Sequence, residues 1–284
     1  KAGGVNIDGA TSSTYTLTQA EVGKTVTASV SYTDGGGTLE TVTSAATQAV
    51  NNVNDAPTGS VTVTGTATQG GTLTAANTLA DADGLGTLSY QWKAGGANIN
   101  GATSSTYTLT QAEVGKTITA SVSYMDGGGT LETVTSAATQ AVVNVNDAPT
   151  GSVTVTGTAT QAQTLTADTS ALADADGLGA LSYQWKAGGA NINGATSSTY
   201  TLTQAEVGKT VTATVSYTDG GGTSETVTSA ATQAIVNVND APTGSVAVTG
   251  TATQGGTLTA ANTLADADGL GTLSYQWKAR WCEY

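Results

Sequence analysis

The stretch Leu88-Ser89-Tyr90-Gln91-Trp92-Lys93-Ala94 alternates apolar and polar side chains. Leu88, Tyr90 and Trp92 therefore share one face of a predicted strand, and this pattern is typical of an antiparallel sheet with one buried face. The same seven residues recur at 181–187 and at 273–279. A strand that returns unchanged along the chain predicts an all-β protein built from copies of one unit.

Other alternating stretches lie on both sides of this strand. Ile118, Ala120 and Val122 alternate with polar residues, and clusters of Gly, Asn and Asp separate the stretches. About seven strands in about 92 residues is the size of an Ig-like β-sandwich. Trp92 would fill the core between its two sheets. The strands predicted in one unit are 59–65, 72–78, 87–94, 97–100, 105–110, 116–124 and 131–142.

The motif Asn-Asp-Ala-Pro-Thr-Gly begins at Asn54, Asn146 and Asn239, and it marks the period of the chain. It predicts a linear array of antiparallel β-sandwiches. The second complete repeat is one residue longer than the first, and the extra residue falls in 167–172, where we expect a loop. The predicted parts are 1–53, the C-terminal half of a repeat; 54–145 and 146–238, two complete repeats; and 239–284, an N-terminal half repeat.

The last five residues, 280–284, depart from the repeat. The chain reads Arg-Trp-Cys-Glu-Tyr where 95–99 would call for Gly-Gly-Ala-Asn-Ile. One inserted base in codons for the repeat would encode the observed residues, so we interpret this tail as a frameshift product; a cloned or natural terminus is the alternative. On the frameshift interpretation the single cysteine, Cys282, has no biological role.

The composition excludes several classes of function. The 284 residues include no His and one Cys, and 8 Lys plus Arg stand against 21 Asp plus Glu, for a formal net charge of −13. Ser-His and Cys-His catalytic pairs and a disulfide framework are therefore excluded. The negative charge would repel phosphate backbones, which argues against nucleic acid as a partner. No apolar run reaches the length of a membrane span, and no residue set supports catalysis.

Most of the acidic residues recur at four places in each repeat. In the first complete repeat these places are the junction at 52–57, the Asp-Ala-Asp-Gly loop at 81–84, the Asp-Gly-Gly-Gly turn at 126–129 and the Gln-Ala-Glu segment at 111–113. In an Ig-like sandwich the first three lie at one pole of the domain and the fourth at the other. Opposite poles of neighbouring domains meet at each linker, so we expect the side chains of one junction to converge.

A group of carboxylate and amide oxygens repels itself unless a hard cation is present, and Ca²⁺ takes six to eight oxygen ligands. The sequence therefore predicts calcium at the junctions. Asp-Gly and Asn-Asp are also ordinary turn formers whose side chains bond their own backbone, and this alternative stays open. Glu132 and Glu225 are expected to be surface charges. The predicted ligands are Glu21, Asn52, Asn54, Asp55, Asp81, Asp83 and Asp126 at the first junction, Glu113, Asn144, Asn146, Asp147, Asp174, Asp176 and Asp219 at the second, and Glu206, Asn237, Asn239, Asp240, Asp266 and Asp268 at the third.

The same segments resemble cadherin-type repeats. The likeness is carried by Ala80-Asp81-Ala82-Asp83-Gly84, by Tyr124-Met125-Asp126-Gly127-Gly128-Gly129 and by the linker at 143–149. It implies calcium between successive domains, which stiffens the array, and in bacterial proteins an extender region of large RTX-type adhesins. Asn144 and Ala148 stand where the family usually has Asp and Asn, which implies fewer or weaker ions. Trp92 and the pattern at 105–110 also resemble bacterial Ig-like domains.

These observations predict a structural extender of a bacterial cell-surface or secreted adhesin, rigidified by calcium at its inter-domain junctions. The expected partners are neighbouring repeats of the same chain, and head-to-tail association of copies through the half repeats is a further expectation. The alternative is an array of carbohydrate- or protein-binding modules attached to a secreted enzyme. Either function places the chain outside the cell or on its surface.

Overall fold

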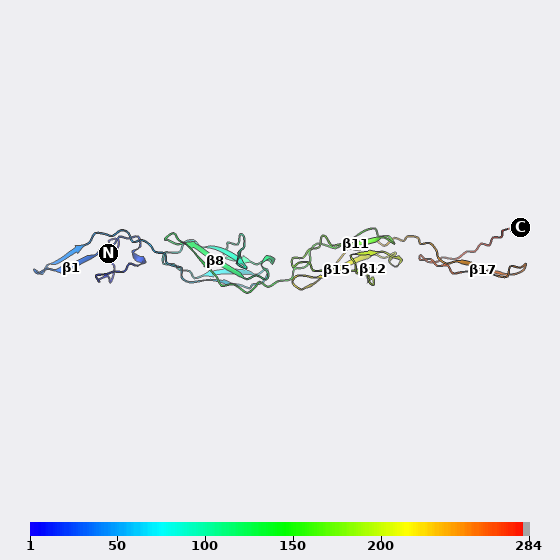
Figure 1. Cartoon of the computed structure of the whole chain (residues 1–284), viewed down its shortest axis with the longest axis horizontal. Coiled ribbons are helices and arrows are strands. Elements are labelled where there is room, and N and C mark those ends of the chain that lie inside the picture. Colours follow the sequence, from blue (N-terminus) through cyan, green and yellow to red (C-terminus); the bar gives the residue numbers. More distant parts are fainter. Residues whose placement is uncertain (281–284) are drawn as a thin grey trace. The chain divides into compact units, whose positions relative to one another are not determined.

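The computed structural model describes residues 1–280, so Cys282 and the rest of 281–284 lie outside the described residues. All named strands pair antiparallel, and 3-10 turns are the only helical elements of residues 1–280 (Figure 1). The chain divides into two units, 1–145 and 146–284. The described part contains no helix that is long and apolar enough to cross a membrane.

Residues 54–145 form a sandwich of two sheets. The order β3-β4-β7 in one sheet and β6-β5-β8-β9 in the other matches the two sheets of an Ig-like domain, so the predicted all-β sandwich is confirmed. The first sheet consists of β3 (Val61–Thr64), β4 (Thr72–Asn77) and β7 (Thr106–Thr108). The second consists of β5 (Ser89–Ala94), β6 (Ala97–Asn98), β8 (Ile118–Met125) and β9 (Leu131–Thr135).

Residues 146–238 repeat this arrangement in the second unit, with sheet orders β10-β11-β14 and β13-β12-β15-β16. The inserted residue lies in the turn after β11, where the amide of Ser170 donates to Asp168 Oδ1 at 2.9 Å. The loop expected there is confirmed, although it begins only after Asp168. The strands are β10 (Thr154–Thr156), β11 (Thr164–Asp168), β12 (Ser182–Ala187), β13 (Ala190–Asn191), β14 (Thr199–Thr201), β15 (Val211–Thr218) and β16 (Ser224–Thr228).

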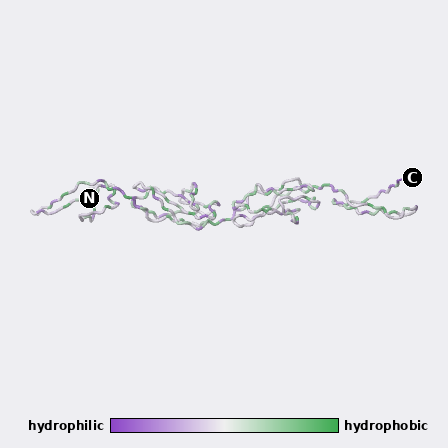
Figure 2. The backbone as a smooth tube through the Cα atoms, in the orientation of Figure 1, coloured by the Kyte–Doolittle hydropathy of each residue, from purple (hydrophilic) through white to green (hydrophobic). Residues whose placement is uncertain are grey.

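A tryptophan occupies the centre of each complete sandwich. Trp92 is 0% exposed, pairs with Ala120 across β5 and β8, and donates its indole N–H to the carbonyl of Ser104 at 2.9 Å. The ring of Tyr107, contributed by the other sheet, lies 6.1 Å from it. A buried indole is stable only with a partner for its N–H, so Trp92 is confirmed as a core residue. Figure 2 shows hydrophobic and hydrophilic positions alternating along the chain.

Two details differ from the predicted elements. The last strand was expected over 131–142 but β9 ends at Thr135, because hydroxyls replace backbone carbonyls as acceptors beyond it. Ser136 Oγ accepts from the amide of Ala120 and Thr139 Oγ1 from that of Ile118, each at 3.0 Å. The segment after β7 contains a 3-10 turn, η2 (Gln111–Glu113), which recurs as η1 (Gln19–Glu21) and η3 (Gln204–Glu206).

The half repeats contain two-stranded sheets. In the first unit, β1 (Ser29–Thr33) pairs with β2 (Leu39–Thr43). In the second unit, β17 (Val246–Gly250) pairs with β18 (Leu258–Asn262). All four strands correspond to strands that face a core in the complete repeats, but here their apolar side chains are exposed.

Candidate metal centre

The Asp-Ala-Asp loop is held in place by its own backbone and by one buried tyrosine. The amide of Asp83 donates to Asp81 Oδ1 at 2.9 Å, and the hydroxyl of Tyr124, on β8, donates to Asp81 Oδ2 at 2.6 Å. Burial and the hydrogen bond to Asp81 raise the pKa of Tyr124, so its hydroxyl stays protonated and remains a donor. The Tyr-Met-Asp segment thus orients the loop as well as ending the strand.

The Asp126 turn packs directly on this loop. The amide of Gly127 donates to the carbonyl of Asp83 at 3.0 Å, and a Cβ at Gly127 would overlap that carbonyl oxygen. Asp126 is buried, and its Oδ1 accepts from the amide of Thr130 at 2.7 Å. Its Oδ2 is also buried and has no hydrogen-bond partner within residues 1–280. Burying a carboxylate oxygen without a partner is costly, so this atom indicates a missing ligand.

The preceding half repeat reaches the same carboxylates within the first unit. The amide of Asp55 donates to Asp83 Oδ2, and the side-chain amide of Gln19, on η1, donates to Asp83 Oδ1, each at 2.7 Å. Asp55, Asp81 and Asp83 are therefore brought together as predicted from the two-pole topology. Gln19 was not among the predicted residues, and its position two residues before Glu21 was the only signal for it.

The two asparagines of the first junction differ in their environment. Asn52 lies against the Asp126 turn, and its Oδ1 is buried without a partner in the described chain. The side-chain amide of Asn54 donates to Glu132 Oε1 at 2.8 Å. Glu132 was expected to be only a surface charge, and this contact ties it to the linker. Its place on β9, just after the acidic turn, could have indicated that.

The three predicted glutamates, Glu21, Glu113 and Glu206, are buried in capping boxes of the 3-10 turns. Glu113 Oε2 accepts from the amide of Thr110 at 2.9 Å and from its hydroxyl at 2.7 Å. This reciprocal capping satisfies backbone donors at the start of a turn. The contact from η1 to the acidic loop is made by Gln19, while one oxygen of each glutamate is engaged within its own turn.

The second unit repeats the acidic geometry. The carboxylates of Asp174, Asp176 and Asp219 supply ligand atoms within 4.8 Å of one another. Tyr217 donates to Asp174 Oδ2 at 2.6 Å, and the amide of Asp147 donates to Asp176 Oδ2 at 2.8 Å. Asp219 is 6% exposed, and its Oδ2 has no hydrogen-bond partner in the described part of the unit.

The asparagines of the middle linker fall in different units. The side-chain amide of Asn146, in the second unit, donates to Glu225 Oε1 at 2.9 Å, as Asn54 does to Glu132. Asn144 ends the first unit, and its Oδ1 is a buried oxygen without a hydrogen bond in the described structure. The Asn-Val-Asn linker thus places one amide group on the acidic turn's hairpin in each repeat.

The third junction lies wholly within the second unit and lacks an acidic turn. The amide of Asp240 donates to Asp268 Oδ2 at 2.9 Å, and the amide of Asp268 donates to Asp266 Oδ1 at 2.9 Å. Hydrogen bonds from the Asp240 backbone, from Asn237 and from Gln204 lower the pKa of Asp268. The side chain of Asn239 donates to the carbonyl of Asp240 at 3.1 Å.

A second glutamine clamps this linker. Gln161 Nε2 donates to Asp240 Oδ2 at 2.8 Å, and its Oε1 accepts from the amide of Val238 at 3.0 Å. Gln161 was not predicted, because it lies almost 80 positions from its partners and only the fold brings them together. The linker is therefore held by amide groups from the A–B turn as well as from η3.

The residues present at the acidic loop and turn fit a calcium ion. They supply only oxygen donors, which Ca²⁺ prefers. Asp126 and Asp219 each direct an unpartnered, buried carboxylate oxygen into a group that already holds two other carboxylates. Like charges so close together repel unless one is protonated or a cation intervenes. Asp81, Asp83 and Asp126, and their counterparts Asp174, Asp176 and Asp219, would hold the ion.

We expect Tyr217→Phe to lower the stability of the second complete repeat by about 1.5–3 kcal/mol, the usual contribution of a hydrogen bond to a charged group. The change removes the donor to Asp174 while it keeps the ring in the core. Urea denaturation followed by hydrogen exchange within 146–238 measures the loss. Tyr183→Phe, on β12, is the matched control. Equal stability of the two variants would show that the Tyr217 hydroxyl does not support the loop.

Comparisons with known proteins place the fold but name no family. No protein-family model and no curated protein matches the sequence. One similar solved structure is described as a Ca²⁺-stabilized adhesin that helps an Antarctic bacterium reach out and bind ice; identity is 16%, coverage is 88% of this chain and 72% of that one, and the TM-score is 0.29. Another contains three N-terminal domains of the highly immunogenic outer capsid protein of bacteriophage RB49, with 16% identity, 76% and 73% coverage and a TM-score of 0.23. At these values the likeness carries no argument about function.

Proposed function

We propose that this chain is a non-catalytic extender region of a bacterial surface or secreted adhesin, in which calcium at the inter-domain junctions stiffens a series of β-sandwiches. The tandem repeats support a spacer, because a length function is served by copying one unit. The absence of His and of any nucleophile-base pair in the sequence fits a structural role. An extender acts outside the cell, which is where we place the protein.

The observation that carries the calcium proposal is the buried Oδ2 of Asp219, which has no hydrogen-bond partner among the described residues, beside the carboxylates of Asp174 and Asp176. A turn stabilised only by its own backbone would leave its second carboxylate oxygen exposed to water. Here the turn buries it. A bound divalent cation would supply charge neutralisation and the missing contact together.

The chain's own residues prepare this site. Tyr217 and the amide of Asp176 orient Asp174, and the amide of Asp147 orients Asp176. In this arrangement the linker residue Asp147 is attached to the acidic loop. Because Asp147 is joined to the loop through its backbone, an ion that orders the loop would also restrict the linker, and restriction of linkers is what an extender requires.

Calcium is expected to raise the unfolding midpoint of the chain. With free calcium at about 100 times the dissociation constant, one site stabilises its repeat by about 2.7 kcal/mol. Calorimetric titration of the chelator-treated protein with calcium chloride measures binding, and thermal unfolding with and without calcium measures the gain. We expect Asp126→Asn together with Asp219→Asn to abolish most of both effects.

Asp8→Asn is the matched control, since it makes the same change of charge at an exposed position away from the junctions. It should leave calcium binding unchanged. The proposal of calcium at these sites fails if the Asp126/Asp219 double variant binds calcium as tightly as the unaltered chain. Small-angle scattering then tests the mechanical role: the maximum dimension should fall when a chelator is added, and an unchanged dimension would contradict stiffening by calcium.

A further inference from the structure

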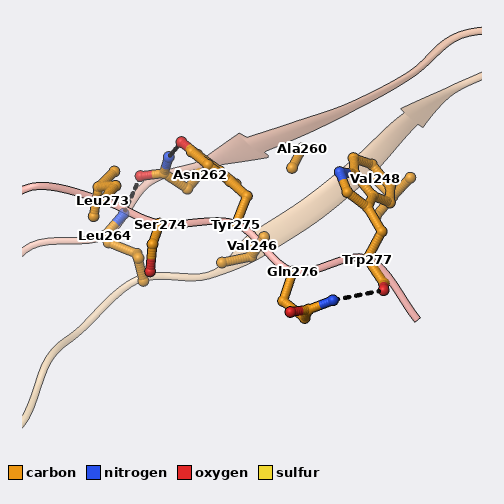
Figure 3. Close-up of a pocket in the computed structure, with 10 residues that line it drawn as sticks. All are labelled: Val246, Val248, Ala260, Asn262, Leu264, Leu273, Ser274, Tyr275, Gln276 and Trp277. Carbon is orange, nitrogen blue, oxygen red and sulfur yellow. Dashed lines mark hydrogen bonds between the residues drawn. The ribbon is translucent and has the colours of Figure 1, made fainter.

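An apolar groove opens in the C-terminal half repeat. It is lined by Val246, Val248, Ala260, Leu273, Tyr275 and Trp277, and Figure 3 shows these side chains along β17, β18 and the following segment. The side-chain amide of Asn262 donates to the hydroxyl of Tyr275 at 3.3 Å, which connects the segment to β18. The groove is thus formed by the same elements that make the first part of a sandwich.

The complete repeats show what covers this surface. Trp277 corresponds to Trp92, yet Trp277 is 51% exposed and Trp92 is 0% exposed. Trp92 is covered because β5 pairs with β8, which contributes Ile118, Ala120 and Val122 to the core. The groove is therefore the position of a β8-type strand, and its free edge is open to backbone pairing.

The N-terminal half repeat carries that strand. Residues 24–34 repeat 116–126 with two changes, Val26 for Ile118 and Thr33 for Met125. Val30 corresponds to Val122 but is 66% exposed, whereas Val122 is 0% exposed. β1 and β2 thus present the apolar face and the strand edge that the groove lacks.

We propose that the groove of one copy of the chain binds the β1-β2 hairpin of a second copy, so that the two half repeats complete one sandwich between chains. Every contact needed already exists inside residues 54–145, with the same side chains at the same register. The hydrophobic effect favours covering both faces, and pairing β1 with 274–279 satisfies backbone groups on both edges. Each copy has one half of each kind, so association continues head to tail.

Other occupants would behave differently. A groove that accepts any apolar peptide would show no preference for register, and a surface that merely aggregates would bury its apolar residues without ordered backbone pairing. The proposed complex has one register, because a slip by one residue would turn the apolar face of β1 to water. The register is therefore the property to test.

Disulfide cross-linking of the full chain tests it. Ser89 pairs with Ser123 in the complete repeat, and Ser274 and Ser31 are their counterparts. Directly paired residues of antiparallel strands lie within disulfide reach. In a Cys282→Ser background, the double variant Ser31→Cys with Ser274→Cys should form a ladder of covalent multimers under mild oxidation, and the ladder should grow with protein concentration.

The control pair is Ser29→Cys with Ser274→Cys, which keeps the same strand and face but lies two residues out of register. Its ladder should form at least several-fold more slowly. Equal rates for the two pairs would overturn the proposal in favour of unspecific association. A cross-linked product that stays one chain in mass, or no product at all, would overturn association between copies. Ser31 and Ser274 are both exposed, so neither change should disturb folding.

Light scattering of the uncross-linked chain supplies an independent readout. The weight-average mass should rise with concentration, and Val30→Asp should reduce it toward the monomer while Ser31→Asp, its neighbour on the polar face of β1, should not. A monodisperse monomer at every concentration would overturn the proposal. The half repeats do not include the acidic loop and turn of a complete repeat together, so this result is expected with chelator present too, and it fails or holds independently of calcium binding.

Discussion

Replacing Trp185 by Ala is expected to lower the free energy of unfolding of the repeat at 146–238 by about 3–5 kcal/mol, which is comparable to a large part of the stability of a small domain. The indole is fully buried among residues of both sheets, and its N–H donates to the carbonyl of Ser197 at 2.9 Å. The substitution removes the packing, leaves a cavity and leaves a buried carbonyl without its donor. Hydrogen exchange of residues 146–238 during urea denaturation measures the effect.

The near-identical repeat at 54–145 serves as an internal reference in the same molecule, because its own tryptophan is untouched. Trp277→Ala is the matched control, since the same residue type is removed from an exposed groove. We expect it to change the midpoint of neither complete repeat. If Trp185→Ala and Trp277→Ala had equal effects on the repeat at 146–238, the indole would not be the centre of that core.

Gly151→Ala is expected to destabilise the same repeat by about 2–5 kcal/mol, because it combines a left-handed backbone with a steric overlap. Gly151 has φ +79°, and a Cβ there would overlap the carbonyl oxygen of Ala171. This close approach occurs where Thr150 and Ala173 exchange backbone hydrogen bonds of 2.7 and 3.0 Å next to the junction. The alanine would therefore separate the start of the repeat from the segment that leads into the acidic loop.

Gly189→Ala separates the two causes. Gly189 has φ +85° but no atom within 4 Å of an added Cβ, so its substitution has only the conformational cost of about 1–2 kcal/mol. Thermal unfolding of both variants, with calcium and with chelator, measures the difference. Equal midpoints would mean that the chain near Gly151 relaxes without cost, and the tight crossing would then have no part in positioning the acidic loop.

The sequence predicted the acidic loop and turn correctly as neighbours, because each is attached to the end of a strand whose place in an Ig-like sandwich is known once the strands are counted. Asp81, Asp83 and Asp126 follow this rule, and so does Asp55 on the linker. The glutamines could not be predicted in this way. Gln19 and Gln161 act through long, uncharged side chains, and their partners are determined by which turn lies next to which linker.

The glutamates illustrate a second limit. The Thr-Gln-Ala-Glu segments at 110–113 and its copies have the spacing of a capping box, and this local reading competes with a role at the junction. Periodicity cannot decide between them, because the side chain of Glu113 can reach its own turn or a neighbouring domain. In the structure one oxygen of Glu113 is taken by Thr110.

Alternation, turn residues and internal repetition, all local properties of the chain, were enough to determine the all-β class, the repeat boundaries and the core tryptophan. They suffice because side chains in a strand alternate between faces whatever the strand pairs with. Only the tertiary structure decided which oxygens are buried without partners, where β9 ends, and that the half repeats expose matching faces. Those properties depend on contacts between segments far apart in the sequence, and no local pattern encodes how closely two such segments approach.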